Sequence, residues 1–350
     1  MTTARKAVLI VATVLLVGGS ALALGAFAMA DFRFENLSNT TRDWDSNTTT
    51  LQPETEAPHT QIVLRDPDGD VRFEPAEGDS FEIVYWTSSE KTVDVVDEGG
   101  VLEITGEGTP LSGVMIMKVE FQDRSTVVKV PRSFTGSITP ETSSGNVDAM
   151  ELDGLEALTL TSGSGSLSTM HVSAGAVTMK TSSGTVGAVG VNAKSVQAAT
   201  SSGSLSLSDI DAEAVETSTT SGSQDFGDLR TGTLKALSSS GGIETAVIDA
   251  DSAEFESSSG TVRALFAGAA TDYDIAASSL SGHVGAPSGA LGAGKRISAH
   301  TASGSIDLKF SKGSEPTEGS ERDTEDLGQD ATTSPGAPAA PASPAAPEAP

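Results

Sequence analysis

Serine is the residue that this sequence places most regularly for chemistry. A serine hydroxyl can attack an ester or amide when a neighbouring base removes its proton. Here a serine precedes a glycine again and again, and no base recurs at a matching place, so we interpret these serines as structural. The Ser-Gly steps fall at nine glycines: Gly145, Gly165, Gly184, Gly203, Gly222, Gly241, Gly260, Gly282 and Gly304.

Carboxylates and histidines could also act as catalysts or ligands. The carboxylates are scattered over expected corners and do not all fall in one column of the repeat: Asp209, Asp211, Asp225, Asp228, Asp249 and Asp251. No metal-binding spacing occurs among the four histidines, which are His59, His171, His283 and His300. The string 66–70 fails the EF-hand pattern, because Val71 stands where that pattern requires glycine. The sequence therefore predicts no enzyme, no cofactor and no metal site.

The Ser-Gly steps define a repeat. Five consecutive intervals from Gly165 to Gly260 are 19 residues long, the first interval is 20 and the last two are 22. Apolar residues stand two, four and seven positions after most of the glycines, which indicates short half-buried strands and no helix. The predicted fold is an all-β β-solenoid (β-helix) of about nine ~19-residue coils over residues 141–310. A β-sandwich is the alternative, which the equal intervals disfavour.

Two local expectations accompany this fold. Glycine adopts a positive φ at no steric cost, so we expect the nine glycines to bend the chain in that conformation. We expect the Ser and Thr residues before them to stack as hydroxyl ladders that bond local backbone or the same residue one coil away. A second corner is expected just after the middle apolar column, at Asp153, Asn192, Asp211 and Asp249.

The N-terminal segment predicts export. Arg5 and Lys6 precede an uncharged apolar run that is long enough to span a bilayer. Residues 1–30 are thus a membrane anchor, a transmembrane helix, or alternatively a signal segment, because residues 28–30 resemble a signal-peptidase site. The expected location is the cell membrane, single-pass with the body extracytoplasmic, or secreted if the segment is cleaved. The net charge of −27 argues against a nucleic-acid partner.

The remaining segments differ in composition. Residues 31–59 form a polar spacer with glycosylation triplets at Asn36, Asn39 and Asn47, and residues 60–140 hold bulky strands that suit an N-terminal β capping region. Residues 311–350 are acidic and then rich in Pro and Ala, which predicts a disordered tail. The two long intervals predict loops, where a basic cluster forms a candidate binding patch: Lys295, Arg296 and His300.

A family resemblance follows from the order of several motifs. Ile62-Val63-Leu64, the strand at 81–85 and Val128-Lys129-Val130-Pro131 lead into Thr142-Ser143-Ser144-Gly145-Asn146-Val147. Over residues 60–310 this order resembles the bacterial putative-adhesin family of unknown function with β-strand repeats. The resemblance implies an exported or membrane-anchored envelope protein with a β-helical body, and it supplies no catalytic residues.

The function expected from these features is binding. The leading hypothesis is a membrane-tethered, non-catalytic scaffold or adhesin that contacts the membrane through its N-terminal helix and binds a cell-wall polymer or surface protein. The first alternative is an envelope-stress accessory protein that signals through a membrane partner. The second is a polysaccharide-cleaving β-helix enzyme. The sequence does not predict the oligomeric state.

Overall fold

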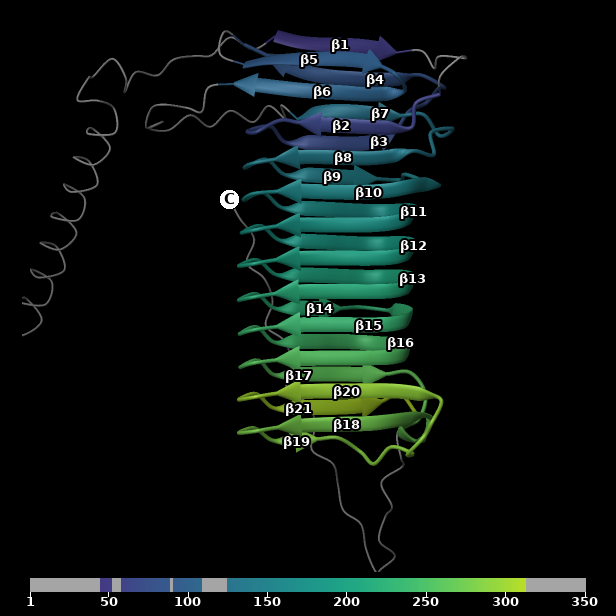
Figure 1. Cartoon of the computed structure of the whole chain (residues 1–350), viewed down its shortest axis with the longest axis vertical. Helices are drawn as coiled ribbons and strands as arrows, with labels where there is room; N and C mark the ends of the chain where they lie inside the picture. The colour runs from purple at the N-terminus through teal and green to yellow at the C-terminus, as the bar shows by residue number, and fades with distance from the viewer. Residues whose placement is uncertain (1–44, 52–57, 89–90, 109–124, 313–350) are drawn as a thin grey trace, which may run out of the picture. The chain divides into compact units, whose positions relative to one another are not determined.

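The computed structural model describes residues 45–51, 58–88, 91–108 and 125–312, which form one stack of strands (Figure 1). The predicted N-terminal helix, most of the polar spacer and all but the first two residues of the predicted disordered tail lie outside these residues. Within the described ranges, no helix has the length and apolar character needed to cross a bilayer.

Each coil contributes one stretch of chain to each of two faces. Face A contains β2 (Gln61–Arg65), β8 (Ser137–Thr142), β10 (Leu155–Ser162), β15 (Leu229–Ser238), and the second halves of β11 (Leu167–Thr181), β12 (Val186–Thr200), β13 (Leu205–Thr219) and β16 (Ile243–Ser257). Face B contains β3 (Val71–Pro75), β9 (Val147–Met150), β14 (Gln224–Phe226), β17 (Val262–Phe266) and the first halves of the same long strands. All these neighbours pair in parallel.

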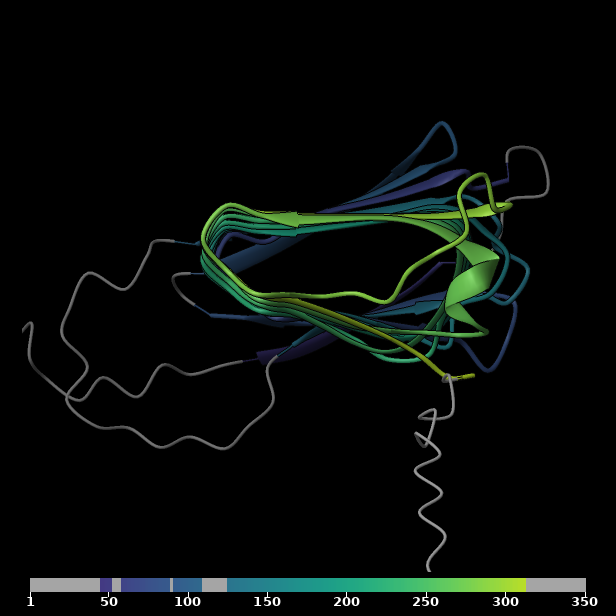
Figure 2. The same cartoon turned by 90° about the horizontal axis from the view of Figure 1, so that it is seen from below.

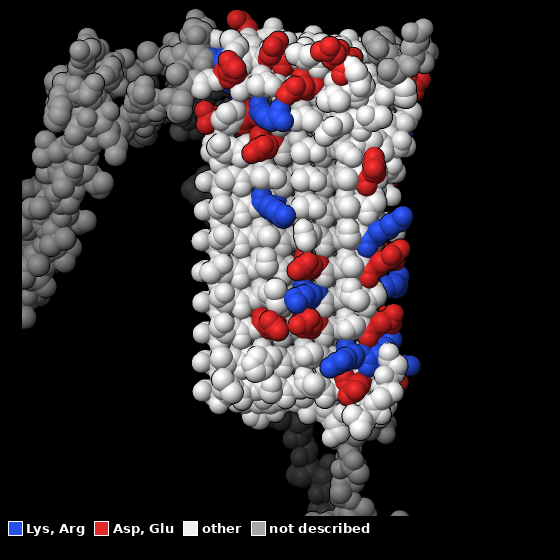
Figure 3. All heavy atoms as spheres, viewed as in Figure 1, with Lys and Arg blue, Asp and Glu red and all other residues white. Residues whose placement is uncertain are grey.

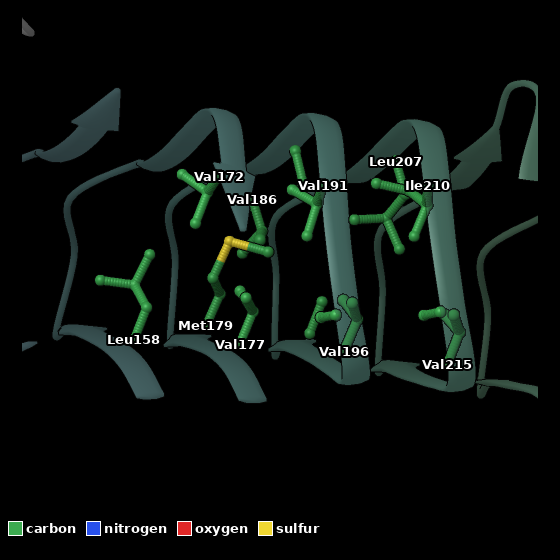
Figure 4. Packing of buried hydrophobic residues seen from close by; sticks show 14 of the residues in the cluster. Leu158, Val172, Val177, Met179, Val186, Val191, Val196, Leu207, Ile210 and Val215 are labelled. Carbon is green, nitrogen blue, oxygen red and sulfur yellow. The ribbon is translucent and has the colours of Figure 1, made fainter. Parts of the chain in front are cut away.

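The register repeats the 19-residue interval of the sequence. Leu167 pairs with Val186, Val186 with Leu205, and Leu205 with Gln224. The inward side chains are buried and mostly aliphatic, and Figure 4 shows valines, leucines and isoleucines of successive coils packed between the faces. The predicted all-β β-solenoid of about nine turns is therefore confirmed.

The order of coils departs from the order of the sequence at both ends. β20 (Lys295–Thr301) lies between β16 and β18 (Tyr273–Ser279), and β21 (Ile306–Phe310) lies between β17 and β19 (Val284–Gly285). The chain passes over one coil position, forms the outermost coil and returns to fill the gap. The longer intervals supply the residues for this crossing, including the short helix η2 (Ala270–Asp272).

At the N-terminal end the coils are also out of sequence order, and antiparallel strands cover the last coil. β2 lies between β8 and β6 (Val101–Gly108), and β3 lies between β9 and β7 (Thr126–Val130). Beyond them β4 (Phe81–Thr87), β1 (Asp45–Leu51) and β5 (Lys91–Glu98) pair antiparallel. Asn47, the one described glycosylation triplet, donates its side-chain N–H to Thr87 Oγ1 at 2.8 Å and so helps to hold β1 on β4.

The reason for glycine at the nine steps differs from our expectation. None of the nine has a positive φ. A Cβ added to any of them would lie less than 3.0 Å from the carbonyl oxygen of the glycine in the adjoining coil. The column begins at Gly69, which adjoins Gly145, and it ends in the order Gly260, Gly304, Gly282. Glycine is required because successive backbones approach too closely for any side chain.

Hydroxyls, buried in every coil but the last, support this column. Three residues before each glycine a Ser or Thr hydroxyl accepts the glycine N–H at 2.7–3.3 Å, from Thr142 to Thr301. Six of these hydroxyls donate onward to the glycine carbonyl of the adjoining coil at 2.8–3.3 Å. The predicted hydroxyl ladder therefore exists, and its link between coils is a glycine carbonyl rather than another hydroxyl.

The left-handed residues lie at the opposite corner. Glu151, His171, Gly190 and Asp209 have φ values of 54°, 52°, 67° and 55° and stand six positions after their glycines. The expected corner positions, Asp153, Asn192, Asp211 and Asp249, follow two positions later and do not make the bend. A non-glycine residue in this conformation costs about 1–2 kcal/mol, which the packing on both sides of the bend must offset.

Candidate functional site

An uncharged corner runs along the stack. We call the corner that carries the nine Ser-Gly steps the serine edge, and the exposed serines that directly precede the glycines follow it coil by coil. In Figure 3 this border, on the left, is white along the coils, while blue and red side chains lie in the middle of the visible face and toward the opposite border. For a chain with a net charge of −27, an uncharged border of this length is a distinctive surface.

A groove of about 670 Å³, which we call the axial groove, lies beside the serine edge. Its wall on face A consists of one outward side chain per coil: Lys180, Ala199, Ser218, Leu237, Glu256 and His300. Its wall on the serine edge consists of small residues: Ser201, Thr220, Ser239, Ser258 and Ala302. Four coil steps separate Lys180 from Glu256, which is about 19 Å at the usual strand spacing.

A second hollow of about 440 Å³ lies at the opposite corner. Its floor is formed by Ala174, Ala193 and Ala212, and its rim includes Lys194 and Glu213. Asp211 also lines it and forms an ion pair with Arg230 at 3.5 Å. This hollow is smaller, charged and limited to fewer coils, so the axial groove is the better candidate for an elongated ligand.

The predicted binding patch divides into three environments, although its residues share strand β20. Lys295 pairs with Asp249 at 2.5 Å and with Asp251 at 3.7 Å, and its Nζ lies 5.6 Å from the centre of the Tyr273 ring. Arg296 lies on face A between its register partners Ser252 and Asp274. His300 contacts Ser278 and lines the axial groove. The structure thus brings only His300 to the groove.

Contacts among Lys295, Asp249 and Tyr273 hold the crossing coil in place and make its stability depend on pH. Burial raises the pKa of Tyr273, whose hydroxyl donates to the Ala267 carbonyl at 3.0 Å. The hydrogen bond that Lys295 donates to the Asp249 carboxylate raises the pKa of Lys295. Both groups hold their protons more tightly in the folded state. Their stabilising contribution is present below the unfolded values of 10.0 and 10.5 and is lost as the pH rises through the folded values.

We therefore expect the wild-type free energy of unfolding to fall as the pH rises above about 10. In a Tyr273→Phe, Lys295→Met double variant it should fall less steeply, because neither titrating group remains. Denaturant unfolding of both proteins across that pH range measures the difference. Parallel curves for the two proteins would show that this cluster does not carry the dependence.

The described residues form neither a metal site nor a catalytic triad. Across the described ranges, no group of three His, Cys, Asp or Glu residues could hold a metal ion. The nearest approach to a nucleophile and base is the exposed pair Ser278 and His300, with Oγ and Nδ1 2.8 Å apart. Glu256 is the register partner of His300, but no described ion pair or hydrogen bond joins their side chains.

Asp66 has a structural role that was not predicted from the sequence. This buried carboxylate accepts the Gly69 N–H at 3.1 Å and pairs with Lys91 at 2.6 Å. It therefore occupies the place that Ser or Thr holds in the later coils. The signal was available, because Asp66 stands three residues before Gly69 as Thr142 stands three before Gly145.

Comparison with known proteins places this stack of coils in a family. The family model described as Toastrack DUF4097 matches residues 59–309. The chain belongs to the Toastrack DUF4097 family. The resemblance drawn from the sequence motifs is confirmed by this match.

Several solved structures are similar to this Toastrack protein. One is described as a putative adhesin from Parabacteroides distasonis ATCC 8503, with 13% identity, 77% of this chain and 98% of that chain covered, and a TM-score of 0.42. Another, described as a putative adhesin from Bacteroides fragilis NCTC 9343, has 11% identity, coverage of 76% and 97%, and a TM-score of 0.41. A third, described as a putative lipid binding protein from P. distasonis ATCC 8503, has 14% identity, coverage of 75% and 96%, and a TM-score of 0.35. No curated protein matches the chain.

Proposed function

We propose that this Toastrack protein is a non-catalytic envelope-binding scaffold or adhesin, held at the cell membrane by its N-terminal apolar segment with the solenoid outside the cytoplasm. The observation that carries the proposal is the axial groove, an elongated surface built from the same positions of successive coils. Stacked repeats place equivalent residues side by side along the solenoid, and solenoid proteins commonly use such extended surfaces for binding.

The groove suits a neutral, hydroxyl-rich polymer, and we propose a cell-wall polymer as its ligand. Ser and Thr hydroxyls both donate and accept hydrogen bonds, as sugar hydroxyls do, and Leu237 offers an apolar contact near the middle. The overall negative charge repels polyanions, whereas the middle of the groove carries no charged side chain. Lys180 and Glu256 mark the two ends of the uncharged stretch.

Binding without turnover is favoured over glycan cleavage. Glycoside hydrolysis requires two carboxylates that face each other across the bond. Glu256 is the one carboxylate among the described residues that line the axial groove. We therefore expect no new reducing ends when the protein is incubated with the polymer that it binds.

A groove-filling variant tests the proposal with a control on the same strand. Ser218 and Ala214 both point outward from β13, and only Ser218 lines the axial groove. We expect Ser218→Trp to weaken co-sedimentation of the full chain with a purified cell-wall preparation by about tenfold, or about 1.4 kcal/mol. Ala214→Trp should bind like the wild type.

Two results would count against this function. Equal binding by both variants would show that the axial groove is not the binding site. Binding no stronger than that of a heat-denatured control would contradict the adhesin function itself. Replacing residues 7–30 by a cleavable signal separates the signalling alternative, because binding survives release from the membrane and signalling through an anchor does not.

A further inference from the structure

The two ends of the solenoid are finished differently. Antiparallel strands extend the N-terminal end, and β5 there carries four charged side chains, on Lys91, Asp94, Asp97 and Glu98. The C-terminal end stops at the coil of β18 and β19. Among the described strands, β18 pairs only with β20 and β19 only with β21. One edge of this last coil therefore has no strand beside it.

The core reaches the surface at this open end. Ile275, Ala277, Val284 and Ala286 pack against the core but are only partly buried, whereas the matching residues of inner coils are fully buried. The two most exposed large apolar side chains among the described residues also belong here, Leu280 at 79% and Leu291 at 96%. A terminal coil of a soluble solenoid normally presents a polar outer face, and this one does not.

The same segment is depleted of charge. Residues 273–294 contain a single charged side chain, that of Asp274, in a chain in which 20% of residues are charged. Depletion of charge at the centre of an apolar patch is typical of protein interfaces. Two copies of a chain with a net charge of −27 repel each other, and a surface with a single charged side chain reduces that repulsion locally.

The hydrogen bonds of β18 show which of its backbone groups are not paired with β20. Leu280 donates its N–H to the Thr301 carbonyl of β20. In β18 the backbone N–H and C=O groups of even-numbered residues therefore point toward β20, and those of odd-numbered residues point away from the stack. The carbonyl of Tyr273 faces outward and accepts the Ala290 N–H at 2.9 Å from the segment that crosses between the faces near one corner (Figure 2). Ala277 and Ser279 lie beyond that segment on the outward side.

We propose that this open end is a self-association surface, on which a second copy of the chain docks end to end. In an antiparallel pairing of two β18 strands, Ala277 lies opposite the partner's Ser279, and Ser278 lies opposite the partner's Ser278 on the two-fold axis. Asp274 then faces the partner's Gly282, so no like charges oppose each other. Because the N-terminal end is extended by charged antiparallel strands, the association closes as a symmetric pair and does not continue into a fibre.

The pairing joins two small surfaces. A strand of seven residues and a spacing of about 10 Å between the faces give an end area of roughly 230 Å², far below a standard interface. The pair is therefore weak in solution, with a dissociation constant on the order of micromolar or above. Confinement of both copies to one membrane would raise their effective concentration.

A single introduced cysteine tests the pairing, because the chain has none of its own. Ser278 would occupy a non-hydrogen-bonded antiparallel pair, with Cα atoms about 4.5 Å apart, which allows a disulfide. We expect full-length Ser278→Cys in detergent micelles to form a disulfide-linked dimer at least about tenfold faster than Ser218→Cys. Ser218 is the matched control, because it has the same outward position in an inner coil.

Two second-site variants in the Ser278→Cys background make the test specific. Ala277→Pro removes an N–H that points away from the stack and is not bonded to β20. Ala276→Lys places a charge on an exposed position opposite the partner's Leu280 in this pairing. Both should reduce cross-linking to the rate of Ser218→Cys and leave the thermal unfolding midpoint within a few degrees of the parent. Cross-linking at the control rate by Ser278→Cys itself, or cross-linking unaffected by both variants, would overturn the proposal. Occupation of this end by the chain's own C-terminal segment predicts the first of these results.

Discussion

Replacing Gly203 by alanine should destabilise the solenoid by about 3 kcal/mol or more, the upper range for overpacking a well-packed interior. The added Cβ would meet the carbonyl oxygen of Gly184, a backbone atom held by the hydroxyl of Thr200 at 3.1 Å. Relief would require the two coils to separate, which stretches the parallel hydrogen bonds on both faces. Urea unfolding followed by circular dichroism measures the loss.

The neighbouring coil offers a control for this variant. Gly187 lies in β12, has no positive φ, and a Cβ added to it would meet nothing within 4 Å. Gly187→Ala should be neutral or stabilise by up to about 1 kcal/mol, because it restricts the unfolded chain. A Gly203→Ala variant as stable as Gly187→Ala would contradict the close-approach explanation of the Ser-Gly repeat.

Replacing Lys91 by methionine should cost about 3 kcal/mol, because it leaves the carboxylate of Asp66 buried without its cation. The two side chains are 14% and 4% exposed, and the carboxylate also holds the first glycine of the column through the Gly69 N–H. Loss of the ion pair thus affects the point where the cap meets the repeat. Thermal unfolding of the full chain checks the expected loss.

Two further variants separate burial from charge in this test. Asp66→Ser together with Lys91→Met installs the residue type of the later coils and should recover most of the lost stability. Arg65→Met removes the cation of the exposed pair with Glu103, whose side chains are 52% and 45% exposed, and should cost at most about 1 kcal/mol. Equal losses for Lys91→Met and Arg65→Met would mean that the buried pair has no special role.

The repeat was predictable because each coil must satisfy the same constraints. The interval of 19 residues between Gly165 and Gly260 returns as the strand register, with Leu167, Val186 and Leu205 aligned. The inverted order of the last two coils was not predictable in this way. A coil presents the same apolar pattern to either neighbour, so the spacing of the glycines shows that loops are present and does not show which coil is outermost.

The candidate site was only partly foreseen. The hydroxyl ladder was expected, but the sequence does not distinguish a glycine chosen for positive φ from one chosen for close approach. The axial groove was missed because its wall on face A joins residues fifteen positions after successive glycines, such as Lys180 and Glu256, that look unrelated along the chain. The basic cluster at 295–300 was conspicuous in the sequence, yet in the structure Lys295 forms an ion pair with Asp249 and does not line the axial groove.

Distances between spin labels on the serine edge test the central claim, that coils stack in equal steps and invert at the C-terminal end. One label at Ser183 is paired in turn with labels at Ser259, Ser303 and Ser281, each directly before a glycine of the column. Steps of about 4.8 Å predict mean separations of roughly 19, 24 and 29 Å in that order. A separation from Ser183 to Ser281 that is shorter than that to Ser303, or separations unrelated to the number of coils, would contradict the account.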